Sequence, residues 1–480
     1  MTRRTALSLL ATGGVWAKSP TLPERIQRLL ENSRLPARGL MGILVEDAAS
    51  GARLYALAPR RHFVPASNTK LFSTALALTR LGPDHRFHTT AVADRSPDSN
   101  GAVSWLTLVG GGDPNLSGRA IPYDPEAEDG EPLAAIEALA GQVADAGVRR
   151  VDGPIVGDDS LYRWEPFPDG WAGSDALWGY GAPVSALSIN DNAIRLRVLS
   201  GDPPRLRLSP ALEYFEIDNR VEAGPEQRIQ VERDPGGRQL RLTGTLPAKR
   251  AGESFLLAVD DPARFAAAAL RDALTRRGVA VRGDAQTRHA TDNGTRPTAG
   301  VELARLTSAP LAELVRIVNK VSQNLHAEML LRAAAHHAFG DASQGAVAKL
   351  LREFLASAGI REDAVDLRDA SGLSRLNLVT PEAVVLLLRS MYGSPHRDLW
   401  MSLLPVAGED GTLRSRMRAA PAAGRIRAKT GTLSHVTGLS GYATQADGQV
   451  VAFSILANNQ AAPSSEVRRL VDKIAEEIAR

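Results

Sequence analysis

A serine and a lysine three positions apart are the first residues in this sequence that could do chemistry. Ser67 precedes Lys70 in the segment 64–72, and apolar residues continue as far as Leu78. If this segment begins a helix, both side chains project from one face, one turn apart. The free N–H groups and the dipole at the helix N-terminus favour developing negative charge. A serine nucleophile needs a base within hydrogen-bond reach, and a lysine with a lowered pKa can be that base.

The alternative is a structural serine cap followed by a solvated lysine. Residue usage argues against that alternative, because the chain has 57 basic residues, of which only 7 are Lys and 50 are Arg. A solvated basic position in this protein is therefore usually Arg. Lysine differs from arginine in that it can lose its proton. A chemical role would explain the rare residue at position 70.

Two further polar stretches fit the same chemistry. Ser-Gln-Asn at 322–324 lies in a long helical region, at an expected break between Asn319 and Leu325. Lys-Thr-Gly-Thr at 429–432 lies on the first of three expected C-terminal strands, and a glycine inside a strand often marks a close approach. Taken singly, the first stretch could be a polar helix break and the second an edge-strand turn. The three stretches together, in this order, point to a catalytic site.

This ordered set resembles the signature of penicillin-binding proteins and serine β-lactamases. Ser322 lies 255 positions after Ser67, far more than a compact β-lactamase leaves. The long insertion resembles the class C low-molecular-mass penicillin-binding proteins, which are D-alanyl-D-alanine carboxypeptidases/endopeptidases of peptidase family S13. Gln323 departs from the family, which more often has Asp or Asn there, and so does Ala370, where Gly is usual. Other stretches that look like the family lie at 180–187, 324–328, 371–375, 404–408 and 439–442.

The resemblance implies a division of labour among the polar residues. Ser67 would attack the carbonyl of the D-Ala-D-Ala bond and form an acyl-enzyme, with Lys70 taking its proton. Ser322 and Lys429 would relay a proton to the leaving amine. Lys429 would also keep the site positive and lower the pKa of Lys70.

The resemblance also implies how substrate is held. Backbone N–H groups of Ser67 and Thr432 would form the oxyanion hole. Asn324 would bind the peptide amide. The hydroxyl groups of Thr430 and Thr432, on either side of Gly431, would bind the terminal carboxylate. Trp171 and Asp175 form an aromatic and acidic pair that could receive an amino-bearing side chain of the substrate, although Trp171 could equally anchor one domain to another.

Composition narrows the function classes further. The formal net charge is +3 and no polybasic run is present, so we expect no nucleic-acid partner. Cysteine is absent, which excludes disulfides and thiol catalysis. The sequence has no His-Glu-x-x-His pattern, and we expect neither a metal nor another cofactor. The expected partners are a peptidoglycan peptide as substrate and β-lactams as inhibitors; the oligomeric state stays open.

The N-terminus resembles an export signal. Arg3 and Arg4 precede an apolar run at 6–17 that ends in Val-Trp-Ala, a small-x-small pattern, so we expect a signal peptide at 1–17 and a periplasmic or cell-envelope protein. The alternative is a first helix of the folded domain. No later stretch has the length of a membrane helix, so we expect no transmembrane anchor.

The expected fold class is α/β (α+β), a β-lactamase/transpeptidase-like domain with an antiparallel sheet and helices, interrupted by a large β-rich insertion. Two alternatives to the peptidase remain: a β-lactamase or esterase on this scaffold, and a non-catalytic cell-wall-binding protein. The expected boundaries are 22–84 and 298–480 for the catalytic domain, 85–190 and 253–297 for the inserted domain, and 191–252 for a second, nested β-rich domain.

Overall fold

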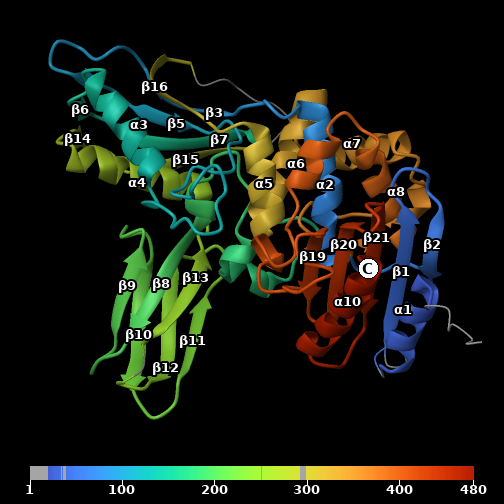
Figure 1. The fold of residues 1–480 in the computed structure, drawn as a ribbon. Coiled ribbons are helices and arrows are strands. Elements are labelled where there is room, and N and C mark those ends of the chain that lie inside the picture. Colours follow the sequence, from blue (N-terminus) through green and yellow to red (C-terminus); the bar gives the residue numbers. More distant parts are fainter. Residues whose placement is uncertain (1–19, 34, 36–38, 250, 292–298) are drawn as a thin grey trace, which may run out of the picture.

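The computed structural model describes residues 20–33, 35, 39–249, 251–291 and 299–480. The expected signal peptide at 1–17 lies outside the described residues. Within the described ranges, no helix is both long and apolar enough to cross a bilayer. The two ends of the chain build one lobe and the insertion builds another, on the left of Figure 1.

A five-stranded sheet forms the base of the lobe built by the chain ends. Its order is β19-β20-β21-β1-β2, and its neighbouring strands are antiparallel. The predicted hairpin and the predicted C-terminal strands are therefore confirmed, and β1 joins them by pairing with β21 along its whole length. The strands are β1 (Leu40–Asp47), β2 (Arg53–Leu57), β19 (Ile426–Leu433), β20 (Val436–Thr444) and β21 (Val450–Asn458).

Helices cover both faces of this sheet, which explains why its central strands are apolar almost throughout. One face packs on α1 (Leu22–Glu31) and α10 (Ser464–Ile478), and these two helices also contact each other. The other face packs on the helical layer that contains α2. The remaining helices of this lobe are α5 (Leu311–Val321), α6 (Asn324–Phe339), α7 (Gln344–Ser357), α8 (Pro381–Tyr392) and α9 (Arg397–Ser402).

The helix predicted after Ser67 lies at the centre of this layer. A short 3-10 turn, η2 (Ala66–Asn68), leads into α2 (Thr69–Leu81). Residues 69–78 are buried on every side of the helix, polar ones included, because α2 packs against both α5 and α6. The predicted break between those two helices is also present, at Ser322.

The insertion contains two groups of strands. The first is a sheet of order β15-β7-β5-β3-β16, against which α3 and α4 pack. Beside it, β4, β6 and β14 form a small sheet. Their bounds are β3 (His88–Ala93), β4 (Ala102–Val103), β5 (Leu106–Val109), α3 (Ala134–Asp145), β6 (Arg150–Val151), β7 (Ile155–Arg163), α4 (Pro262–Arg276), β14 (Ala280–Val281), β15 (Ala285–Ala290) and β16 (Val301–Thr307).

The second group forms two three-stranded sheets, β13-β8-β9 and β10-β12-β11, at the lower left of Figure 1. The division into domains stays a prediction, but two pairings cross its boundaries: β16 pairs with β3, and β13 pairs with β8. The N–H and C=O groups along a strand edge need hydrogen-bond partners, and those partners can come from any part of the chain. The strands are β8 (Ala193–Leu199), β9 (Arg205–Ser209), β10 (Glu216–Ala223), β11 (Arg228–Arg233), β12 (Gln239–Leu246) and β13 (Glu253–Ala258).

Strand β19 lies very close to η2 because it has a glycine at the contact. A Cβ added at Gly431 would lie 2.5 Å from Nδ2 of Asn68 and 2.7 Å from the carbonyl oxygen of Pro65. Asn68 is fully buried, and its Nδ2 donates to that same carbonyl at 3.1 Å. Neither neighbour has room to move, so only glycine fits here.

We expect Gly431→Ala to lower the free energy of unfolding by about 1–3 kcal/mol, the usual cost of overpacking a filled site. Thermal unfolding measures the change. Gly345→Ala is the matched control, because a Cβ there meets nothing closer than 3.7 Å. Equal melting temperatures for the two variants would show that β19 does not need the glycine.

Candidate active site

The structure brings the expected nucleophile and base together. Ser67 lies in η2 and is partly exposed, whereas Lys70 lies in the first turn of α2 and is fully buried. Lys70 Nζ and Ser67 Oγ are 3.0 Å apart. The hydroxyl group is therefore open to a substrate on one side and in contact with an amine on the other.

The other partners of Lys70 set the direction of proton transfer. Its Nζ donates to Oδ1 of Asn324 and to the carbonyl oxygen of Ser371, both at 2.6 Å. Those two oxygens can only accept hydrogen bonds. A neutral amine satisfies them with its two N–H groups, which leaves its lone pair for the hydroxyl proton of Ser67.

Burial lowers the pKa of Lys70 to about 7, although the carboxylates of Asp369 and Glu328 act in the opposite direction. We expected the charge of Lys429 to lower this pKa, but desolvation is the dominant cause. The pKa of Lys429 itself lies well below its ordinary value, first because of burial and then because of the charge of Lys70. Lys70 can therefore act as a base near neutral pH.

The second expected pair, Ser322 and Lys429, is also in contact. Lys429 Nζ donates to Ser322 Oγ at 2.8 Å and to the carbonyl oxygen of Thr430 at 3.0 Å. Ser322 ends α5 in the left-handed conformation, at φ 64°, and α6 begins two residues later. The bend between the helices places Ser322 next to Lys429 and Asn324 next to Lys70.

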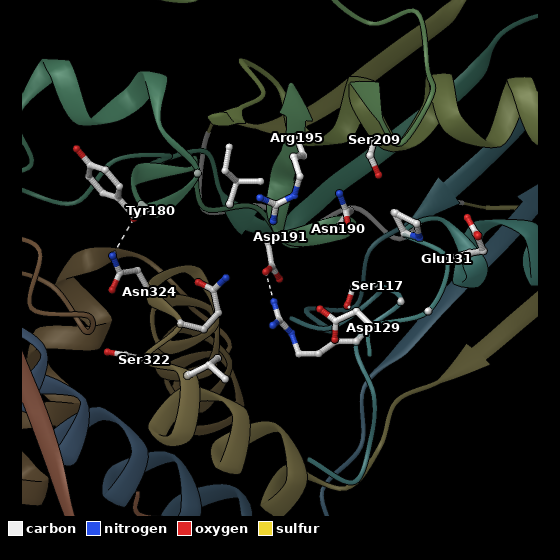
Figure 2. A pocket seen from close by; sticks show the side chains of 18 of the residues that line it. Ser117, Asp129, Glu131, Tyr180, Asn190, Asp191, Arg195, Ser209, Ser322 and Asn324 are labelled. Carbon is white, nitrogen blue, oxygen red and sulfur yellow. Dashed lines mark hydrogen bonds and ion pairs between the residues drawn. The ribbon is translucent and has the colours of Figure 1, made fainter. Parts of the chain in front are cut away.

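The remaining substrate-binding candidates border the same place. Asn324 uses its oxygen for Lys70, and its Nδ2 donates to the carbonyl oxygen of Tyr180 at 2.8 Å (Figure 2). Thr430 Oγ1 donates to Thr412 Oγ1 at 2.9 Å, and Thr432 is exposed. Because Gly431 between them contacts η2, both threonines lie on the strand that runs beside Ser67.

Comparison with known proteins identifies the family of this chain. The model of the D-Ala-D-Ala carboxypeptidase 3 (S13) family matches residues 22–478. The chain belongs to this family. It is 36% identical over 468 residues to a D-alanyl-D-alanine carboxypeptidase of Actinomadura sp., covering 93% of this chain and 83% of that protein. It is 30% identical over 449 residues to carboxypeptidase DacB of Mycolicibacterium smegmatis, covering 92% of this chain and 80% of that protein.

A solved structure shows the same fold. The crystal structure of penicillin binding protein 4 from Haemophilus influenzae superposes with a TM-score of 0.81 at 23% identity, covering 94% of this chain and 98% of that one. The predicted family, the α+β fold class and the serine-type D-Ala-D-Ala carboxypeptidase activity are thus confirmed. The roles of individual residues in this S13 peptidase stay predictions.

Trp171 and Asp175 both lie on the insertion, but only Trp171 is shown in contact with the catalytic lobe. Trp171 Nε1 donates to Oδ2 of Asp369 at 2.9 Å, so the indole is bonded across the two lobes. Asp175 accepts from the hydroxyl group of Tyr180 at 3.1 Å and from the N–H of Ala172 at 3.2 Å. This geometry favours the anchoring interpretation of Trp171, and the substrate role of the pair stays a prediction.

Two buried carboxylates near Lys70 were not among the predicted site residues. Glu328 Oε1 accepts from the N–H groups of Ala370 at 3.0 Å and Ser371 at 2.9 Å. Asp369 accepts from the N–H groups of Gly372 and Ser374, both at 2.8 Å. Together they fix the loop whose Ser371 carbonyl holds Lys70.

One sequence signal for Glu328 was available. It follows Asn324 by four positions on a helix, so both residues share one face. The contact of Glu328 with residues 370 and 371 could not be predicted from the sequence, because this contact joins segments 42 positions or more apart. The pKa of Glu328 is raised to about 8, mainly by burial and then by the charge of Asp369.

We expect Glu328→Gln to change how stability depends on pH. A carboxyl group whose pKa is raised in the folded protein binds its proton more tightly there than in the unfolded chain, so stability falls as pH rises between 4.5 and about 8. Gln cannot ionise and keeps one acceptor oxygen. The melting temperature of the variant, relative to the natural protein, should therefore rise by several degrees across that range.

Glu353→Gln, at an exposed position on α7, is the matched control and should leave the pH dependence unchanged. Parallel curves of melting temperature against pH for Glu328→Gln and the natural protein would contradict the assignment of the raised pKa.

Proposed function

We propose that Ser67 is the nucleophile and Lys70 the general base of this D-Ala-D-Ala carboxypeptidase. The observation that supports this most directly is the set of contacts around Lys70 Nζ, which leaves its lone pair for Ser67. Ser67 Oγ attacks the carbonyl carbon of the D-Ala-D-Ala bond as its proton passes to Lys70. The N–H groups of Ser67 and Thr432 stabilise the resulting oxyanion.

Collapse of the tetrahedral intermediate then breaks the C–N bond. The leaving amine takes a proton from the Ser322 hydroxyl group, which is replenished by Lys429 across their 2.8 Å contact. The products of this half-reaction are free D-alanine and an ester on Ser67. Water hydrolyses the ester in the second half-reaction and regenerates the hydroxyl group.

The substrate is held, in this proposal, along β19. Asn324 binds the amide of the stem peptide, and Thr430 and Thr432 bind the terminal carboxylate on either side of Gly431. The closely apposed lysines add positive charge for that carboxylate. Endopeptidase cleavage of cross-links uses the same groups, and no metal or organic cofactor takes part. An exported, cell-envelope location follows from the substrate and from the residues at 1–17.

We expect β-lactams to acylate Ser67, because their strained amide presents a carbonyl to the same nucleophile. Mass spectrometry of the penicillin-treated protein should place the adduct on the peptide that contains Ser67, and the adduct should be absent from Ser67→Ala. An adduct elsewhere would contradict the assignment. A penicillin adduct that disappears quickly would favour a β-lactamase. The absence of any adduct would favour a non-catalytic protein.

We expect the two lysines to respond differently to replacement by arginine. Arg cannot be neutral at working pH, so Lys70→Arg should lower the acylation rate by about 10²–10⁴-fold, the usual effect of losing a general base. Lys429 acts largely through its charge, so Lys429→Arg should retain part of the rate. The rates are measured with a chromogenic β-lactam, and circular dichroism confirms folding.

The outcome that contradicts this mechanism is a Lys70→Arg variant that is acylated as fast as Lys429→Arg. In that case Lys70 is not the base.

A further inference from the structure

A pocket lies on the other side of the Ser-Gln-Asn segment, between the catalytic lobe and the insertion. Its volume is about 660 Å³, within the range of small-ligand sites. Residues 321–324 form the wall nearest the catalytic groups, and side chains of the insertion form the opposite walls (Figure 2). The Ser-Gln-Asn motif accounts for the wall at 321–324, but neither the catalytic steps nor the motifs account for the walls that the insertion supplies.

One wall of the pocket belongs to an arginine-rich sheet face. Arg195 and Arg197 on β8, and Arg205 and Arg207 on β9, are all exposed and alternate along their strands, so they share one face of the β13-β8-β9 sheet. Arg197 pairs directly with Arg207 across the strands, and Arg195 with Ser209. Arg195, Arg207 and Ser209 line the pocket. We call these four arginines the arginine face.

The arginine face lowers the stability of the sheet unless an anion binds to it. Like charges placed directly opposite each other on neighbouring strands destabilise a sheet. Among the residues that the structure describes, no carboxylate forms an ion pair with any of the four. Several other arginines of the insertion are paired, as Arg220 is with Asp218. The unpaired set therefore points to an anionic ligand from outside the chain.

Carboxylate side chains also line the pocket. Asp129 and Glu131 line the pocket and are exposed, and no ion pair within the described part of the chain involves either. Asp191 also lines it, held in place by Arg119 and by His326 at 2.9 Å. A purely anionic polymer would face these carboxylates, whereas a ligand with both carboxylate and amino groups would complement both the arginines and the carboxylates.

The same contacts join the pocket to the active site. His326 lies on α6 two residues after Asn324, and Asn324 contacts both Lys70 and Tyr180. Ser322 and Asn324 line the pocket as well as contacting the catalytic lysines. A ligand in the pocket therefore lies directly beside the substrate of the reaction.

We propose that the pocket and the arginine face bind a second, carboxylate-bearing peptide stem of peptidoglycan, next to the stem that is cleaved. Such stems carry free carboxylates together with free amino groups. The arginine fork matches a carboxylate with two parallel hydrogen bonds. This inference rests on the proposed function and assigns residues of the insertion to the recognition of a second stem, which is joined to the cleaved stem or adjacent to it in the polymer.

The test compares Arg195→Ser/Arg207→Ser with a charge-matched control, Arg80→Ser/Arg228→Ser, whose arginines are exposed elsewhere. With a cross-linked muropeptide dimer, KM of the first variant should rise about tenfold or more at unchanged kcat, because charge-assisted hydrogen bonds to carboxylates are lost. The control should keep the natural KM. Rates of β-lactam acylation should be equal in all three proteins.

Three further measurements make the test decisive. A dimer with amidated stem carboxylates should show no difference between variant and control. Binding of the unmodified dimer to Ser67→Ala, measured by calorimetry, should weaken when the two arginines are replaced. Relief of like-charge repulsion should leave the melting temperature of the Arg195→Ser/Arg207→Ser variant equal to or above that of the natural protein.

Equal KM values for variant and control, or an equal effect on the amidated dimer, would overturn the proposal. Binding of a glycerol-phosphate oligomer that depends on the arginines, without any effect on the dimer, would also overturn it and assign the face to a phosphate polymer. Failure of the proposed function gives a different pattern, because Ser67 would then not be acylated in any of the proteins, whereas binding to Ser67→Ala would be unaffected.

Discussion

Two lysine side chains buried within one site are the constraint on which the rest of this structure depends. An ammonium group loses its hydration on burial, and a second one nearby adds repulsion. Lys70 and Lys429 are both fully buried, so each must be surrounded by oxygen atoms. Those oxygens come from Ser67, Asn324, Ser371, Ser322 and the backbone of β19. The cost of burying the lysines is also what lowers the pKa of Lys70 to about 7.

Several parts of the catalytic lobe hold those oxygen atoms in position around the two lysines. The bend at Ser322 presents Ser322 and Asn324 to different lysines, and a straight helix would separate them on its surface. Glu328 and Asp369 hold the loop that supplies the Ser371 carbonyl, and Trp171 ties this loop to the insertion. Removing the insertion would therefore disturb the loop that holds Lys70, the proposed base, even though the insertion contributes none of the four proposed catalytic side chains.

The insertion adds an exposed, positively charged surface next to the buried lysines of the catalytic lobe. Lys70 and Lys429 are buried and hydrogen-bonded within the chain, whereas the arginine face is exposed and unpaired among the described residues. Buried groups of this kind suit reaction steps that exclude water, and exposed charges suit recognition of a polymer. Under the proposed function, the Ser-Gln-Asn segment contributes both to the catalytic site and to the proposed recognition pocket.

The sequence by itself determined the order of the motifs, the family, the helix after Ser67, the antiparallel strands and the break at Ser322, because these depend on local spacing and periodicity. Only the tertiary structure decided which groups surround Lys70, since the Ser371 carbonyl contacts it from a segment far away in the chain and Glu328 holds that segment in place. It also decided that β16 pairs with β3 beyond the expected domain boundary, because strand pairing depends on which edges lie free. The arginine face was invisible in the sequence because β8 and β9 bring their arginines together only when they pair in register.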